Sequence, residues 1–164
     1  MARSAAYYAV IIGVLLWCTA LLVLPLAASA RISTAGIGYG FFSHICHQED
    51  SRSLHIAGYP LAVCARCSAI YFGFFFGVLL YPFLSGKVSF PPRWMWIIAV
   101  APMMFDVGAD VIGLHVSSIP TRLASGSVFG VSAALILTPL LVGACSELIN
   151  RHLHQSGIHH ERET

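Results

Sequence analysis

The sequence predicts an all-α, polytopic membrane protein, built as a bundle of about four transmembrane helices. Of its 164 residues, 57% are hydrophobic and only 10% are charged, whereas a soluble domain of this size carries about 25% charged residues. Short polar breaks separate its long apolar runs, and a helix needs about 20 apolar residues to cross the hydrocarbon core. We therefore expect one transmembrane domain over residues 1–149, surrounded by the lipid bilayer, and a polar tail over 150–164.

The first two apolar runs cover residues 7–30 and 61–84. A cleaved signal peptide is the alternative for the first run, but its apolar stretch exceeds the roughly 7–15 residues of a signal core. The second run contains Arg66 near its start. Because a charge in the hydrocarbon is costly, we expect this guanidinium at the membrane interface or in the bundle interior.

The last two apolar runs cover residues 94–115 and 121–148. Gly126 and Gly130 lie four residues apart in the fourth run. This spacing places them on one helix face, where small residues let another helix approach closely. Pro139 predicts a kink in the same helix, because proline removes one backbone hydrogen bond.

Four crossings return both termini to one side of the membrane and place the segments 31–60 and 113–120 on the other. Lys and Arg residues are divided almost evenly between the two sides. If Arg52, Arg66 and Arg122 belong to a site, the remaining positive charges favour cytoplasmic termini. We therefore expect a multi-pass protein of the cell membrane whose Cys/His-rich segment between the first two helices lies outside.

The positive charges do not indicate a nucleic-acid partner. The nine Lys and Arg residues are scattered along the chain, whereas nucleic-acid binding needs a basic patch or stripe. A homo-oligomer or another membrane protein is compatible with the composition, which does not select between them.

The five cysteines fall into two kinds. Cys18 and Cys145 lie inside apolar runs, where a cysteine usually acts as a small buried hydrophobe. Cys46, Cys64 and Cys67 lie in or beside the polar break between the first two runs. Only these three are placed to meet water, a metal ion or each other.

The spacing of these three cysteines favours a metal site. Seventeen residues, 47–63, separate Cys46 from the Cys64-Ala-Arg-Cys67 pair, similar to the spacer of a zinc ribbon. Three thiolates from two chain segments suit zinc, or iron, and leave one tetrahedral position. Geometry favours a fourth ligand that does not adjoin Cys46. The candidates are His44, His47 and His55.

A second hypothesis uses the same sulfurs for redox chemistry. Cys64 lies near the start of a predicted helix and close to Arg66, and both features stabilise a thiolate. Cys64 and Cys67 would then form the reactive pair of a membrane thiol–disulfide oxidoreductase, with Cys46 as a third thiol. By broad analogy with other four-helix membrane enzymes of this kind, a quinone would accept the electrons.

The third predicted helix carries Asp106 and Asp110, four residues apart and therefore on one face. Each should face a cation or a polar cavity, because an intramembrane carboxylate costs about 2.5–3.5 kcal/mol on insertion scales. Arg122 is the nearest candidate partner. The alternatives are a packing ion pair and a polar pocket, the latter suiting a small transporter or binding protein. Whether the protein is an enzyme stays open, and its candidate catalytic residues are Asp106, Asp110, Arg52, Arg66 and Arg122.

A combined motif resembles an uncharacterised family of small bacterial and archaeal membrane proteins, a domain of unknown function. The matching residues are Cys46-His47-Gln48, Arg52-Ser53, Gly58, Cys64-Ala65-Arg66-Cys67, Ile70-Tyr71 and Gly73, followed by Arg122, Ser125 and Gly126.

The resemblance covers about residues 43–130 and has two departures. Ser68-Ala69 stands where the family has Thr-Gly, and Val107 stands where it has a glycine. The resemblance implies His47 as the fourth metal ligand. It implies no reaction, because the family has no settled activity.

Overall fold

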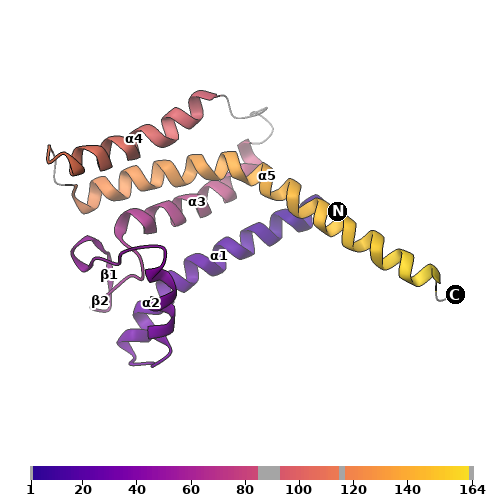
Figure 1. Cartoon of the computed structure of the whole chain (residues 1–164), viewed down its shortest axis with the longest axis horizontal. Helices are drawn as coiled ribbons and strands as arrows, with labels where there is room; N and C mark the ends of the chain where they lie inside the picture. The colour runs from indigo at the N-terminus through magenta and orange to yellow at the C-terminus, as the bar shows by residue number, and fades with distance from the viewer. Residues whose placement is uncertain (1, 85–92, 115–116, 163–164) are drawn as a thin grey trace.

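The computed structural model describes residues 2–84, 93–114 and 117–162 (Figure 1). Three helices in this part of the chain, α1 (Ala2–Ser29), α3 (Ala65–Leu84) and α5 (Ile119–Arg162), are long and apolar enough to cross a membrane. The remaining helices are α2 (Ala35–Ser43), a single 3-10 turn at Asp50–Arg52, and α4 (Arg93–Val111). The prediction of an all-α, multi-pass membrane protein is confirmed.

Helix α4 overlaps the third predicted crossing, 94–115, but ends at Val111, and residue 115 lies outside the described residues. It runs alongside α5 (Figure 1). That it crosses the bilayer stays a prediction. We expected the last helix to end at residue 148, but α5 continues to Arg162. No proline occurs between residues 149 and 162, so nothing in this stretch removes a backbone donor or clashes with the preceding turn. Pro139 lies within α5, and the helix changes direction along its length (Figure 1).

Close packing of α3 against α5 forms the centre of the bundle. A Cβ atom built on Gly130 would lie 2.3 Å from the backbone oxygen of Ile70, and one on Gly126 would lie 2.6 Å from that of Arg66. In the same way, a Cβ atom built on Gly73 of α3 would lie 2.8 Å from a backbone oxygen of α5, and one built on Gly77 would lie 2.9 Å from another. The predicted small-residue face is therefore confirmed, because no larger side chain fits at these positions.

The segment between α1 and α3 is folded rather than extended. After α2 comes a two-stranded antiparallel hairpin of β1 (His55–Ile56) and β2 (Tyr59–Pro60). Ala57 and Gly58 connect the strands with positive φ angles of 53° and 82°, as a type I′ turn requires. The pattern of the sequence did not indicate these elements.

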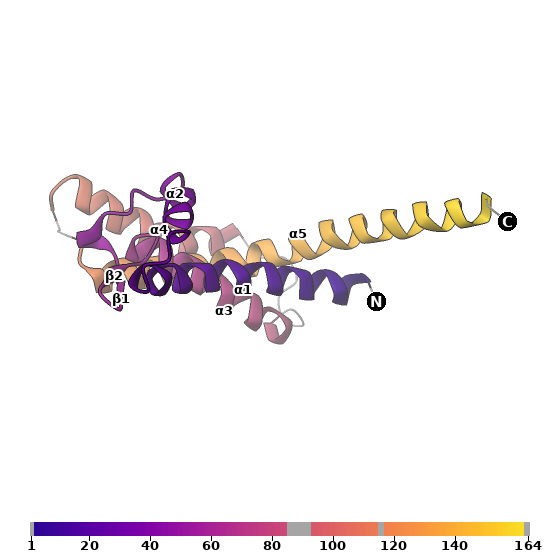
Figure 2. The same cartoon turned by 90° about the horizontal axis from the view of Figure 1, so that it is seen from below.

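A hydrophobic cluster supports this segment against α1. Leu21 of α1 packs with Phe42 of α2 and with Leu61, Ala62 and Val63, the residues that precede α3. Trp17 adds edge-on ring contacts to Phe41 and Phe42. Two perpendicular views agree that α2, the hairpin and the end of α4 lie at one end of the bundle, while the last part of α5 extends past the other (Figures 1 and 2).

Candidate metal centre

Three cysteine sulfurs meet at the hairpin end of the bundle. The Sγ atoms of Cys46, Cys64 and Cys67 lie within 4.8 Å of one another. Cys46 is buried, the other two are partly buried, and all three are free thiols. One sulfur follows α2 and the other two stand at the start of α3. Cys18 and Cys145 are not part of this group.

Gln48 ties together the two segments that carry these sulfurs. Its side-chain amide donates hydrogen bonds to the carbonyl oxygens of Tyr39 and Ala62, each 2.8 Å long. The Tyr39 hydroxyl adds a 2.6 Å bond to the Pro60 oxygen. Because Gln48 lies two residues after Cys46, and Ala62 two residues before Cys64, these bonds fix the separation of the sulfurs.

The surroundings of Cys64 favour its thiolate form. The backbone N–H of Cys64 donates to the Cys46 sulfur over 3.2 Å. A hydrogen bond from the Cys67 thiol lowers the pKa of Cys64 well below its usual value, and backbone donors of Cys67 and Arg66 act in the same direction against the effect of burial. A thiolate is the form that binds metal or attacks a disulfide.

No histidine joins the three sulfurs in the described part of the chain. The His44 Nδ1 atom lies 2.9 Å from the Gly40 oxygen, and the His55 Nε2 atom lies 3.0 Å from an Asp50 carboxylate oxygen. His47 is exposed. The structure therefore brings together the three predicted cysteine ligands and none of the three predicted histidines.

A buried network of polar side chains begins at Arg66, between the two cysteines of the pair. Its guanidinium donates to the Asp106 carboxylate of α4, with 14% of the Arg66 side chain and 9% of the Asp106 side chain exposed. Two hydroxyl groups also donate to Asp106, from Ser117 at 2.9 Å and Ser125 at 3.2 Å. Of the two positions expected for Arg66, the membrane interface or the bundle interior, its low exposure and its partner on α4 favour the interior.

A second ion pair lies beside the first. Arg122 of α5 donates to an Asp110 carboxylate oxygen over 3.0 Å and also to the Ser117 carbonyl over 3.1 Å. The Ser117 N–H donates to the other Asp110 oxygen over 3.2 Å. The sequence predicted Arg122 as the cation nearest to both carboxylates, whereas the structure gives each carboxylate its own arginine.

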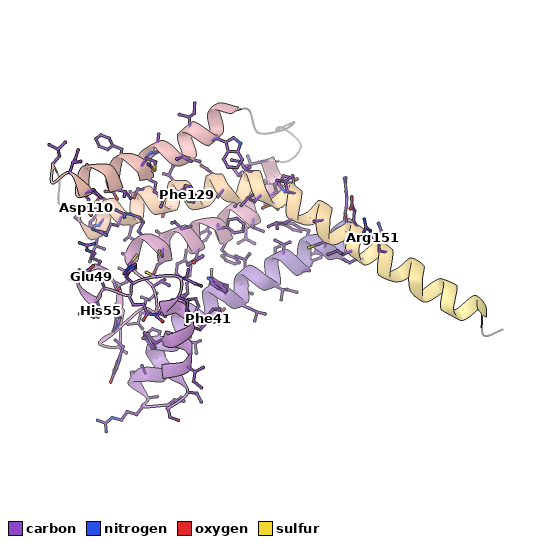
Figure 3. The ribbon with its side chains drawn as sticks, viewed as in Figure 1. Phe41, Glu49, His55, Asp110, Phe129 and Arg151 are labelled. Carbon is purple, nitrogen blue, oxygen red and sulfur yellow. The ribbon has the colours of Figure 1, made fainter. Side chains whose placement is uncertain are left out.

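Arg52 lies outside the buried network. It belongs to the exposed turn before the hairpin and pairs with Glu49 over 3.2 Å. Glu49, His55 and Asp110 all lie at the hairpin end of the bundle (Figure 3). Of the five candidate catalytic residues, the structure thus joins four in the buried network and leaves one on the surface.

A cavity of about 750 Å³ lies against α4 and α5 next to the network. Asp106, Thr121 and Ser125 contribute its polar side chains, and the rest of its lining is apolar. Both Asp106 oxygens already accept hydrogen bonds.

Sequence reasoning gave no role to Gln48, Ser117 or Ser125. Gln48 and Ser125 belong to the family motif, so the sequence marked these residues, but it did not show which hydrogen bonds they make. Ser117 lies in a turn whose sequence gave no signal, because its importance comes from bonds to residues 7 and 11 positions away.

Comparisons with known proteins identify relatives but no activity. A family model described as predicted membrane protein (DUF2085) matches residues 46–136. An uncharacterized protein of Methanocaldococcus jannaschii is 38% identical over 104 residues, covering 62% of this chain and 67% of the relative. An uncharacterized protein of Methanothermobacter thermautotrophicus is 31% identical over 101 residues, covering 61% of this chain and 89% of the relative. No solved structure matches significantly. With the model spanning more than half of the chain, the protein belongs to the DUF2085 family of predicted membrane proteins.

Proposed function

We propose that the protein holds a zinc ion on Cys46, Cys64 and Cys67 at one face of the membrane. The supporting observation is the meeting of three free thiols, within 4.8 Å of one another, from two segments far apart in the chain. Zinc is bound by tetrahedral sets of cysteine and histidine, with Zn–S distances of about 2.3 Å. Small side-chain rotations bring sulfurs at these separations onto one ion.

The groups around the cysteines support the same proposal. A metal-bound thiolate keeps its charge more readily when backbone N–H groups donate to it, and Cys64 supplies such a donor to Cys46. The Gln48 bonds hold the two ligand segments together before the ion arrives. Such preorganisation lowers the entropic cost of binding.

The fourth ligand is a water molecule or one of the nearby histidines. The family resemblance implies His47, which is exposed and adjoins Cys46. His44 and His55 would each have to leave a present partner, Gly40 or Asp50. Replacing each histidine by alanine separates these alternatives, because only the loss of the true ligand weakens zinc binding.

In this proposal the metal site is held in place by the Arg/Asp network, which consists of the ion pairs Arg66–Asp106 and Arg122–Asp110. Arg66 sits between two ligands, and its ion pair with Asp106 anchors the start of α3 to α4. In the described residues both carboxylates of α4, Asp106 and Asp110, are engaged by guanidinium groups. This pairing favours a structural role over transport through the same residues.

Elemental analysis of the purified protein tests the proposal. We expect about one zinc per chain in wild type, and a loss of most of it in Cys46→Ser, Cys64→Ser and Cys67→Ser. Cys18→Ser and Cys145→Ser are the matched controls and should keep the metal, because these thiols lie outside the group. Less than about a tenth of an equivalent of zinc or iron in wild type would refute the metal site.

The redox hypothesis is the second candidate, favoured by the lowered pKa of Cys64 beside Cys67. Oxidation of this pair would release two protons and two electrons, which a quinone would take up as it becomes a hydroquinone. The Arg66 guanidinium does little to stabilise a Cys64 thiolate, because it is engaged by Asp106 and Ser117. A metal-free wild type whose thiols form a reversible Cys64–Cys67 disulfide would favour this candidate instead.

A further inference from the structure

A second cavity, with more polar groups in its lining, lies at the end of the bundle away from the cysteines. It has a volume of about 400 Å³ and is formed by α1, α3 and α5. Arg3, Ser4 and Tyr8 line it from α1, and Tyr81 lines it from α3. Pro139 and Val142 of α5 supply apolar contacts. Figure 1 shows the N-terminus, where Arg3 lies, far from the hairpin.

The donors in this cavity are available for a ligand. Within the described residues, no carboxylate pairs with Arg3, and Ser4, Tyr8 and Tyr81 make no side-chain hydrogen bond. Glu147 lies one helical turn beyond Gly143, another lining residue, but it forms no ion pair with Arg3. A guanidinium with several hydroxyl groups is a donor set that suits phosphate oxygens.

The position of the cavity indicates that such a phosphate belongs to a lipid headgroup. The apolar span of α1 begins at Arg3, and that of α3 ends at Leu84, three residues after Tyr81. The cavity therefore lies where two apolar spans end, the level at which tyrosine and arginine side chains meet lipid headgroups. Its apolar wall on α5 suits the first carbons of an acyl chain.

We propose that this cavity binds the phosphate group of an anionic membrane phospholipid. Arg3 contacts the phosphate, and the hydroxyl groups of Ser4, Tyr8 and Tyr81 donate further hydrogen bonds. Most of the lining lies outside residues 46–136, the part matched by the family model.

The test measures lipid retained by the purified full-length protein with native mass spectrometry. Protein is incubated separately with phosphatidylglycerol, with phosphatidylcholine and with inorganic phosphate. We expect retained phosphatidylglycerol, with Arg3→Gln lowering the affinity about tenfold, because a charge-assisted bidentate contact is lost. Tyr81→Phe should cause a smaller loss, since it removes one neutral donor.

Arg151→Gln is the matched control. It removes the same charge from an exposed position of α5 that does not line the cavity. Equal retention by Arg3→Gln and wild type, or an equal loss in Arg151→Gln, would overturn the proposal. Arg3-dependent binding of inorganic phosphate as tight as that of phosphatidylglycerol would overturn the lipid source. Circular dichroism verifies that each variant keeps its helix content.

Discussion

The cysteine group and the Arg/Asp network are neighbours, but the charges of the network are paired with one another and the thiols of the cysteine group are free. In the network, each of four buried or partly buried charges has an opposite partner. In the cysteine group, three free thiols lie within 4.8 Å of one another. Arg66 stands between Cys64 and Cys67 but directs its charge to Asp106 rather than to the sulfurs.

This difference shows which of the two regions has ligand groups that are still free. Two charges removed from water are stabilised only when their geometry and remaining hydrogen bonds are good, as they are around Asp106. Both Asp106 oxygens are occupied, so this carboxylate has little capacity left for a ligand, although the Arg66 Nε atom is buried without a hydrogen-bond partner. Three converging thiols have unused binding capacity, which a metal ion or an oxidant can take up.

The largest expected effect is the loss of Asp106. Asp106→Ala leaves the Arg66 guanidinium buried without its carboxylate and should destabilise the protein by about 3–5 kcal/mol. Reversible unfolding in mixed detergent micelles measures this free energy. The double variant Arg66→Met with Asp106→Leu should recover most of the loss, because it removes both charges. A single-variant loss below about 1 kcal/mol would show that the pair is not effectively buried.

Asp110→Ala should destabilise the protein less than Asp106→Ala, although it also removes hydrogen bonds to a charged group. The Asp110 side chain is 23% exposed, so water can replace part of the lost interaction with Arg122. The same unfolding measurement gives the comparison. If Asp110→Ala were more harmful than Asp106→Ala, the order of importance within the network would be reversed.

Gly126→Ala tests the close contact that both regions share. The new methyl group would lie 2.6 Å from the Arg66 backbone oxygen and should cost about 1–3 kcal/mol through overpacking. We also expect weaker zinc retention, because Arg66 lies between two ligands. Gly108→Ala is the control, since nothing lies within 4 Å of a Cβ atom there. Equal stability of the two variants would contradict the close packing of α3 on α5.

Cys64→Ser should have the smallest effect on the metal-free protein, less than about 1 kcal/mol, because sulfur and oxygen differ little in size and the site is partly exposed. Its effect on zinc content should nevertheless be large. Comparing unfolding with and without a chelator separates the two contributions. A strong destabilisation of the metal-free variant would mean that this thiol supports the fold rather than a ligand.

Local signals in the sequence predicted the bundle and the meeting of three cysteines. Apolar length identified the spanning helices, glycine spacing identified the α3–α5 contact, and the spacing of Cys46, Cys64 and Cys67 indicated their meeting. Each of these signals depends on residues close in sequence or on one helix face, where the geometry of the backbone is nearly fixed.

Other features depend on tertiary contacts and escaped prediction. Gln48 matters because it bridges Tyr39 and Ala62, and the partner of Arg66 is 40 residues away. The hairpin places Ala57 at a positive φ angle, which alanine rarely adopts, so the turn carried only half of its usual signal in Gly58. The histidines were near Cys46 in sequence, but His44 and His55 take other partners in the fold.

X-ray absorption at the zinc edge of the purified wild-type protein tests the metal site most directly. We predict three sulfur scatterers at about 2.3 Å and one nitrogen or oxygen at about 2.0–2.1 Å. In Cys64→Ser the spectrum should lose a sulfur or the zinc should be absent. A wild-type spectrum with no sulfur neighbours, or zinc that remains unchanged in Cys64→Ser, would contradict a zinc ion held by Cys46, Cys64 and Cys67.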